Sequence, residues 1–366
     1  MYYKLSTNTF YKDMEFPRFH FPSGTEMFPT HDVVWKYLDS YAKSFNLTVH
    51  IKYHHLVQKV LAIPDEKWKI SVRNLPINRN EKSLFDAVFV CSGINSSPRI
   101  PKIKGVTEFK GKIMHSRSYR KPDKFNGECV LVIGSGPSGK DIVDQLLEAG
   151  TVNRLTHSYQ MPISKEPPKE NKFMGKARAL CASCFIGKKK NLQSTQESAF
   201  TVKGEVKRFT KYGVEFQDGS LQNYTVVIYA TGYRYSYPFL DKNTGIHVKD
   251  YSVEPLYKHI LNIKHTTMAF IGITSGGAHN PMYDLQARFA LTFISGRKQL
   301  SSYKDMLKDM EMQAKICIDK GRPQGKPHIL GSDQKEYFAQ LARTAEIENV
   351  PDIFADIFLD ESIFFE

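Results

Sequence analysis

The stretch from Val130 to Val143 constrains the fold more than any other part of this chain. It reads VLVIGSGPSGKDIV, an apolar run followed by G-x-G-x-x-G and then by an amphipathic segment that opens on a polar residue. The apolar run predicts a buried strand, and glycines placed directly after it predict a tight turn into a helix. The succession of strand, glycine turn and helix predicts a dinucleotide-binding unit of the Rossmann type.

Each glycine of this turn has an expected task. Gly134 permits the tight turn, Gly136 lets the backbone approach a diphosphate, and Gly139 lets the helix pack closely on the strand. The free amides of the helix N-terminus would then face the diphosphate. A glycine-rich turn without a ligand is the alternative.

Composition limits the class of protein. The 366 residues are 41% hydrophobic and 24% charged, which is ordinary for an α/β protein of two domains. The longest apolar runs fall short of the roughly 18 residues of a membrane span, so we expect no transmembrane segment. The net charge of +13 suits an anionic cofactor. It is not accompanied by a nucleic-acid recognition module, so we expect no nucleic-acid partner.

The cysteines give little support to a disulfide scaffold or a metal site. There are five of them, and the C-x-x-C formed by Cys181 and Cys184 has no second pair. We therefore expect a reducing compartment and no metal. The N-terminal MYYKL also lacks the apolar region of a signal peptide.

Two further strands end in small residues, one on each side of the glycine fingerprint. Cys91-Ser92-Gly93 follows a short apolar run, and Ala230-Thr231-Gly232 follows another. Such endings let the chain leave a sheet and pass close to a cofactor, so we expect a second nucleotide-binding domain that contains the first as an insertion. Helices are expected at 31–45, with Val34, Leu38, Tyr41 and Phe45 packed on a core, and at 281–296, 305–320 and 334–343. Residues 160–200 are polar and basic, and are expected to form a long excursion.

Several ordered motifs resemble those of flavin-containing monooxygenases. Residues 109–119, FKGKIMHSRSY, resemble the identifying sequence F-x-G-x-x-x-H-x-x-x-Y/F of that family. Residues 230–233, ATGY, resemble its A-T-G-[YF] motif, and residues 5–8, LSTN, resemble its L-x-T-N. Residues 256–260 and 284–288 resemble its C-terminal stretches. The resemblance covers essentially the whole chain.

The resemblance implies an α/β fold with two dinucleotide-binding, Rossmann-like domains, the NADPH domain being inserted in the FAD domain. The expected ranges are 1–124 for the first part of the FAD domain, 125–235 for the NADPH domain, and 236–366 for the second part of the FAD domain with C-terminal helices. Asn8 would be the catalytic residue, acting through its amide near the flavin. The cofactor-binding residues that the resemblance implies are Thr7, Gly134, Gly136, Ser138, Gly139, Lys140, Asp141, Thr231, Asp284 and Gln286.

The second strand of the fingerprint unit bears on the choice between NADPH and NADH. NAD sites place Asp or Glu after this strand, where the carboxylate binds the ribose 2′-hydroxyl. Here the strand is expected at residues 153–156, followed by His157 and Ser158. The missing carboxylate favours NADPH, and Lys165 is a candidate to supply positive charge.

The function implied is NADPH- and FAD-dependent oxygenation of a soft nitrogen or sulfur atom of a small molecule through a hydroperoxyflavin. The family carries its own FAD fingerprint before L-x-T-N, whereas the first sixty residues here contain only Gly24. We therefore expect the FAD domain to be incomplete at its N-terminus, through a truncated isoform, an incomplete gene model or a degenerate paralogue. The alternative is an NADPH-binding protein without flavin that acts as a binding or regulatory protein.

The expected localisation is cytoplasmic. Peripheral association with the endoplasmic reticulum membrane and a homo-oligomeric state stay open.

Overall fold

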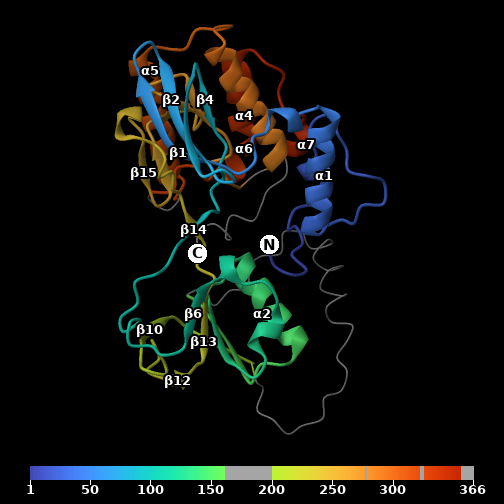
Figure 1. Ribbon diagram of the computed structural model, residues 1–366, viewed down its shortest axis with the longest axis vertical. Helices are drawn as coiled ribbons and strands as arrows, with labels where there is room; N and C mark the ends of the chain where they lie inside the picture. The colour runs from blue at the N-terminus through green and yellow to red at the C-terminus, as the bar shows by residue number, and fades with distance from the viewer. Residues whose placement is uncertain (161–199, 277, 322–324, 356–366) are drawn as a thin grey trace. The chain divides into compact units, whose positions relative to one another are not determined.

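The computed structural model describes residues 1–160, 200–276, 278–321 and 325–355. The chain divides into two compact units, one formed by Met1–Arg99 with Gly232–Glu366 (unit 1) and the other by Ile100–Thr231 (unit 2; Figure 1). Unit 2 is thus a single insertion in unit 1. Residues 100–124, which we expected in the first range, lie in unit 2 because a strand within them joins its sheet. Lys165, Cys181, Cys184 and the expected excursion at 160–200 lie almost wholly outside the described residues.

Unit 2 is built on a parallel five-stranded sheet in the order β6-β13-β7-β8-β9. Its strands are β6 (Lys112–His115), β7 (Cys129–Ile133), β8 (Arg154–Ser158), β9 (Phe200–Lys203) and β13 (Val226–Tyr229). The central strand β7 is apolar because both faces of the sheet are covered. Helix α2 (Pro137–Ala149) packs on the sheet through Ile142 and Leu146, both fully buried. The prediction of a Rossmann-type unit at the fingerprint is confirmed.

A small antiparallel sheet completes unit 2. It consists of β10 (Val206–Phe209), β11 (Gly213–Phe216) and β12 (Leu221–Asn223). Its buried aromatic side chains pack with Leu131 of β7 and Val227 of β13 in one apolar cluster. This second layer is why the sheet of unit 2 is buried on the side away from α2.

Unit 1 carries several smaller sheets and most of the helices. The sheet β17-β18-β19-β4 contains one parallel pair, β19 with β4, and the sheet β1-β2-β3 is antiparallel. Helices α4 and α6 lie side by side (Figure 1) and share an apolar core with α5. The strands are β1 (His55–Ile63), β2 (Lys67–Asn74), β3 (Arg79–Phe85), β4 (Val88–Val90), β5 (Ser97–Pro98), β14 (Tyr233–Arg234), β15 (His247–Lys249), β16 (Ser252–Glu254), β17 (Leu256–Tyr257), β18 (Leu261–Asn262) and β19 (Met268–Phe270). The helices are α1 (His31–Ser44), α4 (His279–Ile294), α5 (Tyr303–Asp319), α6 (Gln334–Ala345) and α7 (Asp352–Ala355).

Helix α1 forms where we expected it, but the prediction of its packing face is only half right: Val34 and Tyr41 are half-buried, and Tyr41 stacks on Phe16 at a centroid distance of 4.4 Å. Leu38 and Phe45 are 43% and 55% exposed, and the buried side chain is Tyr37. The Tyr37 ring stacks on Phe21 at a centroid distance of 3.8 Å, and its hydroxyl donates to Phe19 O at 2.8 Å. The N-terminal aromatic residues therefore select the buried face of α1, which coincides only in part with the stripe that periodicity suggested.

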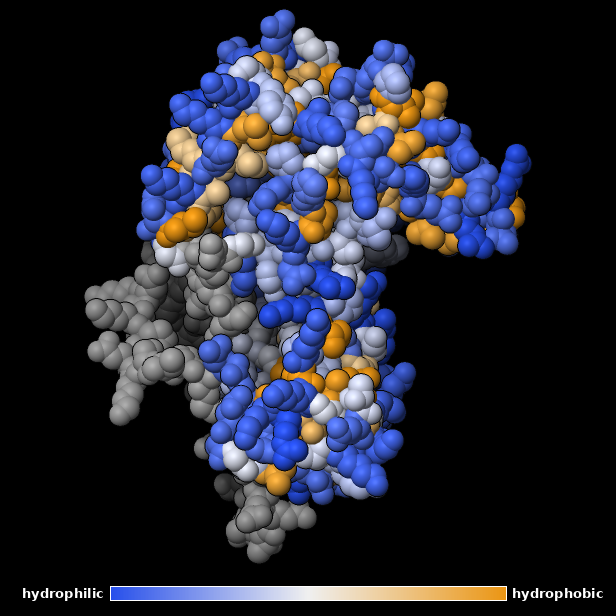
Figure 2. Space-filling model, turned by 90° about the vertical axis from the view of Figure 1, so that its left-hand side faces the viewer, coloured by the Kyte–Doolittle hydropathy of each residue, from blue (hydrophilic) through white to orange (hydrophobic). Residues whose placement is uncertain are grey.

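Hydrophilic residues dominate the face shown in Figure 2, and hydrophobic side chains reach the surface in patches among them. Within the described ranges, no helix is long and apolar enough to cross a membrane.

Candidate functional site

The glycine turn of unit 2 is shaped by two close backbone contacts. Gly134 has a φ of +122°, a conformation that residues with a Cβ rarely adopt, and a Cβ there would lie 2.3 Å from Ala230 O. A Cβ on Gly139 would lie 2.3 Å from Gly134 O. Both positions therefore require glycine for the fold of the turn itself. The same contacts place the strand end at Ala230 and Thr231 directly beside the fingerprint.

Gly136 differs from its two neighbours in the motif. It has a φ of −63° and a ψ of 173°, which any residue can adopt, and a Cβ there would have no protein atom within 4 Å. Gly136 is also the N-cap of α2, and no side chain caps this helix. Orphan N–H groups and the positive end of the helix dipole at such a terminus attract anions. The open space and the uncapped helix fit a diphosphate.

The other predicted residues of this turn lie at the start of α2. Ser138 and Asp141 are half-buried, and Lys140 is exposed. Thr231 is half-buried at the end of unit 2. The structure thus brings Gly134, Gly139 and Thr231 together within one unit, as close packing of β7, α2 and β13 requires.

Strand β8 extends two residues farther than we expected, so the residues that directly follow it, where a ribose would bind, are different ones. His157 and Ser158 are strand residues with buried side chains, and Ser158 Oγ donates to Gly204 O at 2.7 Å. The residues after the strand are Tyr159 and Gln160, so a carboxylate is still absent at the strand end. The expectation that His157 and Ser158 occupy the ribose position is therefore wrong. The argument against NADH still holds, because it depends on the missing carboxylate.

His157 contacts the glycine turn instead. Its Nε2 lies 2.7 Å from Gly134 O, and its ring packs against Tyr159 at a centroid distance of 4.8 Å. Burial lowers the pKa of His157 below its ordinary value, and nearby Lys140 acts in the same direction. The hydrogen bond to Gly134 and the carboxylate of Asp144 oppose this shift. Sequence reasoning missed this contact, because it depends on how far β8 runs.

The motif at residues 109–119 has a structural role in unit 2. Its histidine, His115, is buried at the end of β6, and its Nδ1 accepts a hydrogen bond from Arg117 N at 3.1 Å. Tyr119 is fully buried and donates to Gln145 Oε1 of α2 at 3.3 Å. The motif therefore ties the edge strand to the fingerprint helix, and His115 acts as a cap of a short turn.

In unit 1, the N-terminal motif lies in an irregular segment with a bend at residues 8 and 9, and hydrogen bonds of Thr7 hold it. Thr7 N donates to Pro29 O at 3.0 Å, and the Thr7 hydroxyl donates to Thr9 O at 2.8 Å. Asn8, which lies between them, is exposed. The same N-terminal region reaches α4, because Asn280 Nδ2 donates to Met14 O at 2.6 Å.

The two predicted residues of α4 have different environments. Asp284 is partly exposed and forms an ion pair with Arg288 at 2.8 Å. Gln286 is fully buried, and its Oε1 accepts from Gly272 N at 2.9 Å. Its Nε2 donates to Thr274 Oγ1 at 2.8 Å and to Tyr337 OH at 3.0 Å. Gln286 therefore holds the segment that follows β19, with its whole amide engaged by protein groups.

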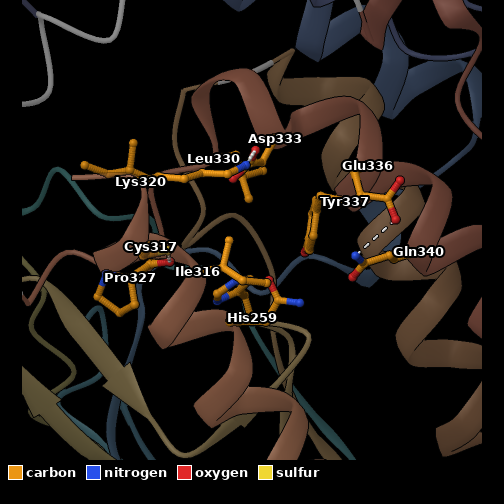
Figure 3. A pocket seen from close by; sticks show the side chains of 12 residues that line it. His259, Ile316, Cys317, Lys320, Pro327, Leu330, Asp333, Glu336, Tyr337 and Gln340 are labelled. Carbon is orange, nitrogen blue, oxygen red and sulfur yellow. Dashed lines mark hydrogen bonds and ion pairs between the residues drawn. The ribbon is translucent and has the colours of Figure 1, made fainter. Parts of the chain in front are cut away.

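A pocket of about 160 Å³ lies in unit 1 beside α5 and α6 (Figure 3), and it contains none of the predicted site residues. Several polar side chains that line it bind one another: Lys320 pairs with Asp333, and Gln340 Nε2 donates to Glu336 Oε1 at 3.2 Å. We assign it no role. The lining residues are His259, Gln313, Ile316, Cys317, Lys320, Pro327, Ile329, Leu330, Asp333, Glu336, Tyr337 and Gln340.

Comparisons with known proteins give the family. The model of the flavin-binding monooxygenase-like family matches residues 1–156 and 190–366. Senecionine N-oxygenase of Tyria jacobaeae is 31% identical over 359 residues, which are 98% of this chain and 73% of that protein. Flavin-containing monooxygenase 3 of Oryctolagus cuniculus is 30% identical, with 97% of this chain and 75% of that protein covered.

The fold agrees with solved structures. The S-allyl-L-cysteine S-oxygenase of Allium sativum superimposes with a TM-score of 0.79 at 25% identity, over 100% of this chain and 82% of that one. Tmm of a Pelagibacter strain gives a TM-score of 0.74 at 23% identity over 94% and 71% of the two chains, which is a likeness of fold. These relatives share two Rossmann-like domains with this chain. The chain belongs to the flavin-binding monooxygenase-like family, whose flavin-containing monooxygenases are oxidoreductases.

Proposed function

We propose that this chain is an NADPH- and FAD-dependent monooxygenase that oxygenates a soft nucleophilic nitrogen or sulfur of a small molecule. In the overall reaction, one atom of O2 goes to the substrate and the other leaves as water. NADPH and one proton supply the hydride and the proton that this requires. The observation that carries the proposal is the open position at Gly136, above an uncapped helix N-terminus and between two glycines that the fold itself requires.

The NADPH part of the proposal rests on unit 2. We assign the diphosphate to Gly134, Gly136, Ser138 and Gly139, with Lys140 supplying positive charge at the mouth of the turn. Asp141, one turn into α2, is the remaining cofactor-binding residue of this proposal. Backbone amides and the helix dipole would do most of the binding, because they are fixed by the fold before the ligand arrives. In this proposal the NADPH-binding domain is unit 2, residues 100–231, in place of the expected 125–235.

The FAD part rests on unit 1, so its proposed domain is residues 1–99 with 232–366, in place of the expected 1–124 with 236–366. The segment after β19 leads into α4, whose N-terminus has no side-chain cap, and ligands of α/β sheets bind at such strand ends. The site we propose there includes Thr7 and Asp284, with Gln286 fixing the backbone at Gly272, whereas Thr231 belongs to unit 2 and is proposed to bind cofactor there, beside Gly134. FAD, when bound, would supply the redox chemistry that activates O2. Within the 366 residues the G-x-G-x-x-G pattern occurs at 134–139 alone, so we assign no residue to the FAD diphosphate.

Asn8 is the residue that we assign to catalysis. Its side chain is exposed. The backbone before it is held by the hydrogen bond from Thr7 N to Pro29 O, and the backbone after it by the hydrogen bond from the Thr7 hydroxyl to Thr9 O. A carboxamide offers two N–H donors and an acceptor without titrating, so it can orient an oxygen-bearing group without delivering a proton. The role we propose is to hold that group by hydrogen bonding and to slow its loss to water.

The names of two relatives support the proposed substrate class. One relative is named for N-oxygenation of senecionine and one solved structure for S-oxygenation of S-allyl-L-cysteine. We propose that this chain acts on an amine nitrogen or a sulfide sulfur of a small molecule, both of which are soft nucleophiles.

A second candidate is an NADPH-binding protein without flavin. The observation that favours it is that the open turn at Gly136 and the uncapped N-terminus of α2 lie wholly within unit 2 and need no flavin. The two candidates make the same prediction for NADPH binding and opposite predictions for flavin.

The test is a visible spectrum of the 366-residue protein after incubation with excess FAD and desalting, followed by NADPH oxidation with and without an amine or a sulfide. Retained flavin absorption and substrate-dependent formation of the N-oxide or S-oxide support the monooxygenase. The Asn8→Ala variant should retain flavin but lose coupling, so that NADPH is consumed with little oxygenated product. A colourless protein that binds NADPH would leave the second candidate.

A further inference from the structure

We propose that His157 is a positioning residue for the dinucleotide, which orients the Gly134 carbonyl away from the diphosphate and so keeps the glycine turn open to anions. The inference rests on the proposed NADPH site at α2. His157 belongs to no motif that the family resemblance supplies, and it reaches the turn from the neighbouring strand.

The first step is that β8 holds Gly134 by both of its backbone groups. Gly134 N donates to Ser158 O at 2.9 Å, and Gly134 O lies 2.7 Å from His157 Nε2. Two consecutive residues of one strand thus fix the first glycine of the fingerprint. This matters because Gly134 has a φ of +122°, and glycine is the residue whose backbone most readily changes conformation.

The second step is the direction of the hydrogen bond. A carbonyl oxygen can only accept, so His157 must carry its proton on Nε2. The imidazole is buried and packs against Tyr159, which limits its rotation. The donor is present in both the neutral and the protonated ring, so the contact does not depend on the charge of His157.

The third step is the consequence for an anion. A carbonyl turned toward the diphosphate would place its lone pairs against phosphate oxygens, and this repulsion is strong where water is excluded. With Gly134 O bound to His157, the carbonyl points into the protein, where Gly139 also packs against it. The groups left facing the ligand are then the N–H donors of the turn and of α2.

The experiment compares three variants by titration of NADPH, with the fluorescence of the nicotinamide as the readout and the melting temperature recorded for each. His157→Phe keeps a planar ring without a donor and should weaken NADPH binding about 3- to 10-fold, the usual range for one hydrogen bond. His157→Gln can present an N–H at a similar reach, and its affinity should stay within about 2-fold of the wild type. His157→Asn has the same chemistry on a shorter side chain, so it should resemble His157→Phe.

A second ligand separates positioning from general damage. 2′-AMP carries the adenosine and its 2′-phosphate but no diphosphate, so its own dissociation constant, obtained by competition with NADPH and corrected for the Kd of NADPH, should be unchanged by His157→Phe. If the wild type binds NADPH and all three variants bind it equally well, the inference about His157 is overturned while the proposed function stands. Equal weakening in His157→Gln and His157→Phe would also overturn it. If the wild type does not bind NADPH, the proposed function and the inference both fail. Should His157→Phe not fold, the contrast between His157→Gln and His157→Asn decides.

Discussion

Replacing Gly136 and Gly134 separately by alanine would separate binding from folding at the glycine turn. At Gly134, alanine has to adopt a φ of +122° and bring its Cβ to 2.3 Å from Ala230 O. The backbone strain costs about 1–3 kcal/mol, and the overlap a further 1–3 kcal/mol or so. We expect Gly134→Ala to lower the free energy of unfolding by roughly 2–6 kcal/mol, a large part of the stability of a typical domain.

At Gly136, alanine meets no protein atom within 4 Å and keeps an ordinary backbone conformation. Loss of a glycine N-cap costs about 0.5–1 kcal/mol, and the smaller entropy of the unfolded chain returns about 0.4–1 kcal/mol. The net change in unfolding free energy should lie within about 0.5 kcal/mol. The added methyl group would stand where the diphosphate approaches, so the Kd for NADPH should rise about 10-fold or more.

The assay is urea denaturation of both variants together with NADPH titration by fluorescence. The reasoning predicts that Gly136→Ala is stable and binds poorly, and that Gly134→Ala is unstable. A Gly136→Ala protein that binds NADPH with unchanged affinity would refute the placement of the diphosphate. A Gly134→Ala protein as stable as the wild type would refute the steric argument for the turn.

Three further outcomes are expected. Gln286→Met leaves Gly272 N without its acceptor in the core and should cost about 1–3 kcal/mol in urea denaturation. Asp284→Asn breaks a partly exposed ion pair and should change stability by less than about 1 kcal/mol, while flavin retention after desalting falls. His328 is buried, and its pKa lies well below 6.5, mainly because of burial and in addition because of the nearby His259. His328 therefore stays neutral in the folded protein at a pH at which it binds a proton in the unfolded chain. The contribution of His328 to the free energy of unfolding is therefore fully present above pH 6.5 and is lost on acidification below it, by at most about 1.4 kcal/mol per pH unit. Burial also lowers the pKa of His157 and His279, so His328→Gln should reduce the slope in urea titrations between pH 7 and pH 5 without abolishing it.

The sequence predicts the fingerprint unit well because its signals are local. An apolar run, glycines at fixed spacing and a helical stripe all lie within Val130–Val143, and the structure forms β7 and α2 there. Helix α1 shows the limit of this reasoning. Its location follows from its own residues, but its buried face is chosen by Phe19 and Phe21, which lie earlier in the chain and fold back on Tyr37. A periodic pattern cannot identify such a partner.

The candidate site shows the same division. The need for glycine at 134 and 139 could be anticipated from the motif, because the fold of a strand–turn–helix unit imposes it. The roles of His157 and Gln286 could not, since each acts through a backbone group brought close by a neighbouring element. His157 contacts Gly134 from the neighbouring strand β8, and Gln286 contacts Gly272 from helix α4. The signal that was available for His157 was its place at the end of the second strand, but the strand runs farther than its composition suggested.

Substitutions that test the NADPH part and the flavin part of the proposed reaction should therefore affect stability differently. The NADPH half relies on backbone groups around an open position, so a variant such as Gly136→Ala can lose binding and keep its stability. The flavin half relies in part on the amide of Gln286, which is buried and fully engaged, so a change there removes stability together with function. A loss of activity in a Gln286 variant consequently says little about contact with the flavin. The informative positions in unit 1 are the accessible ones, Asn8 and Asp284, where the structure provides little reason for a change in stability. An effect on flavin retention or coupling at these two positions, with an unchanged unfolding free energy, would locate the reaction on this unit.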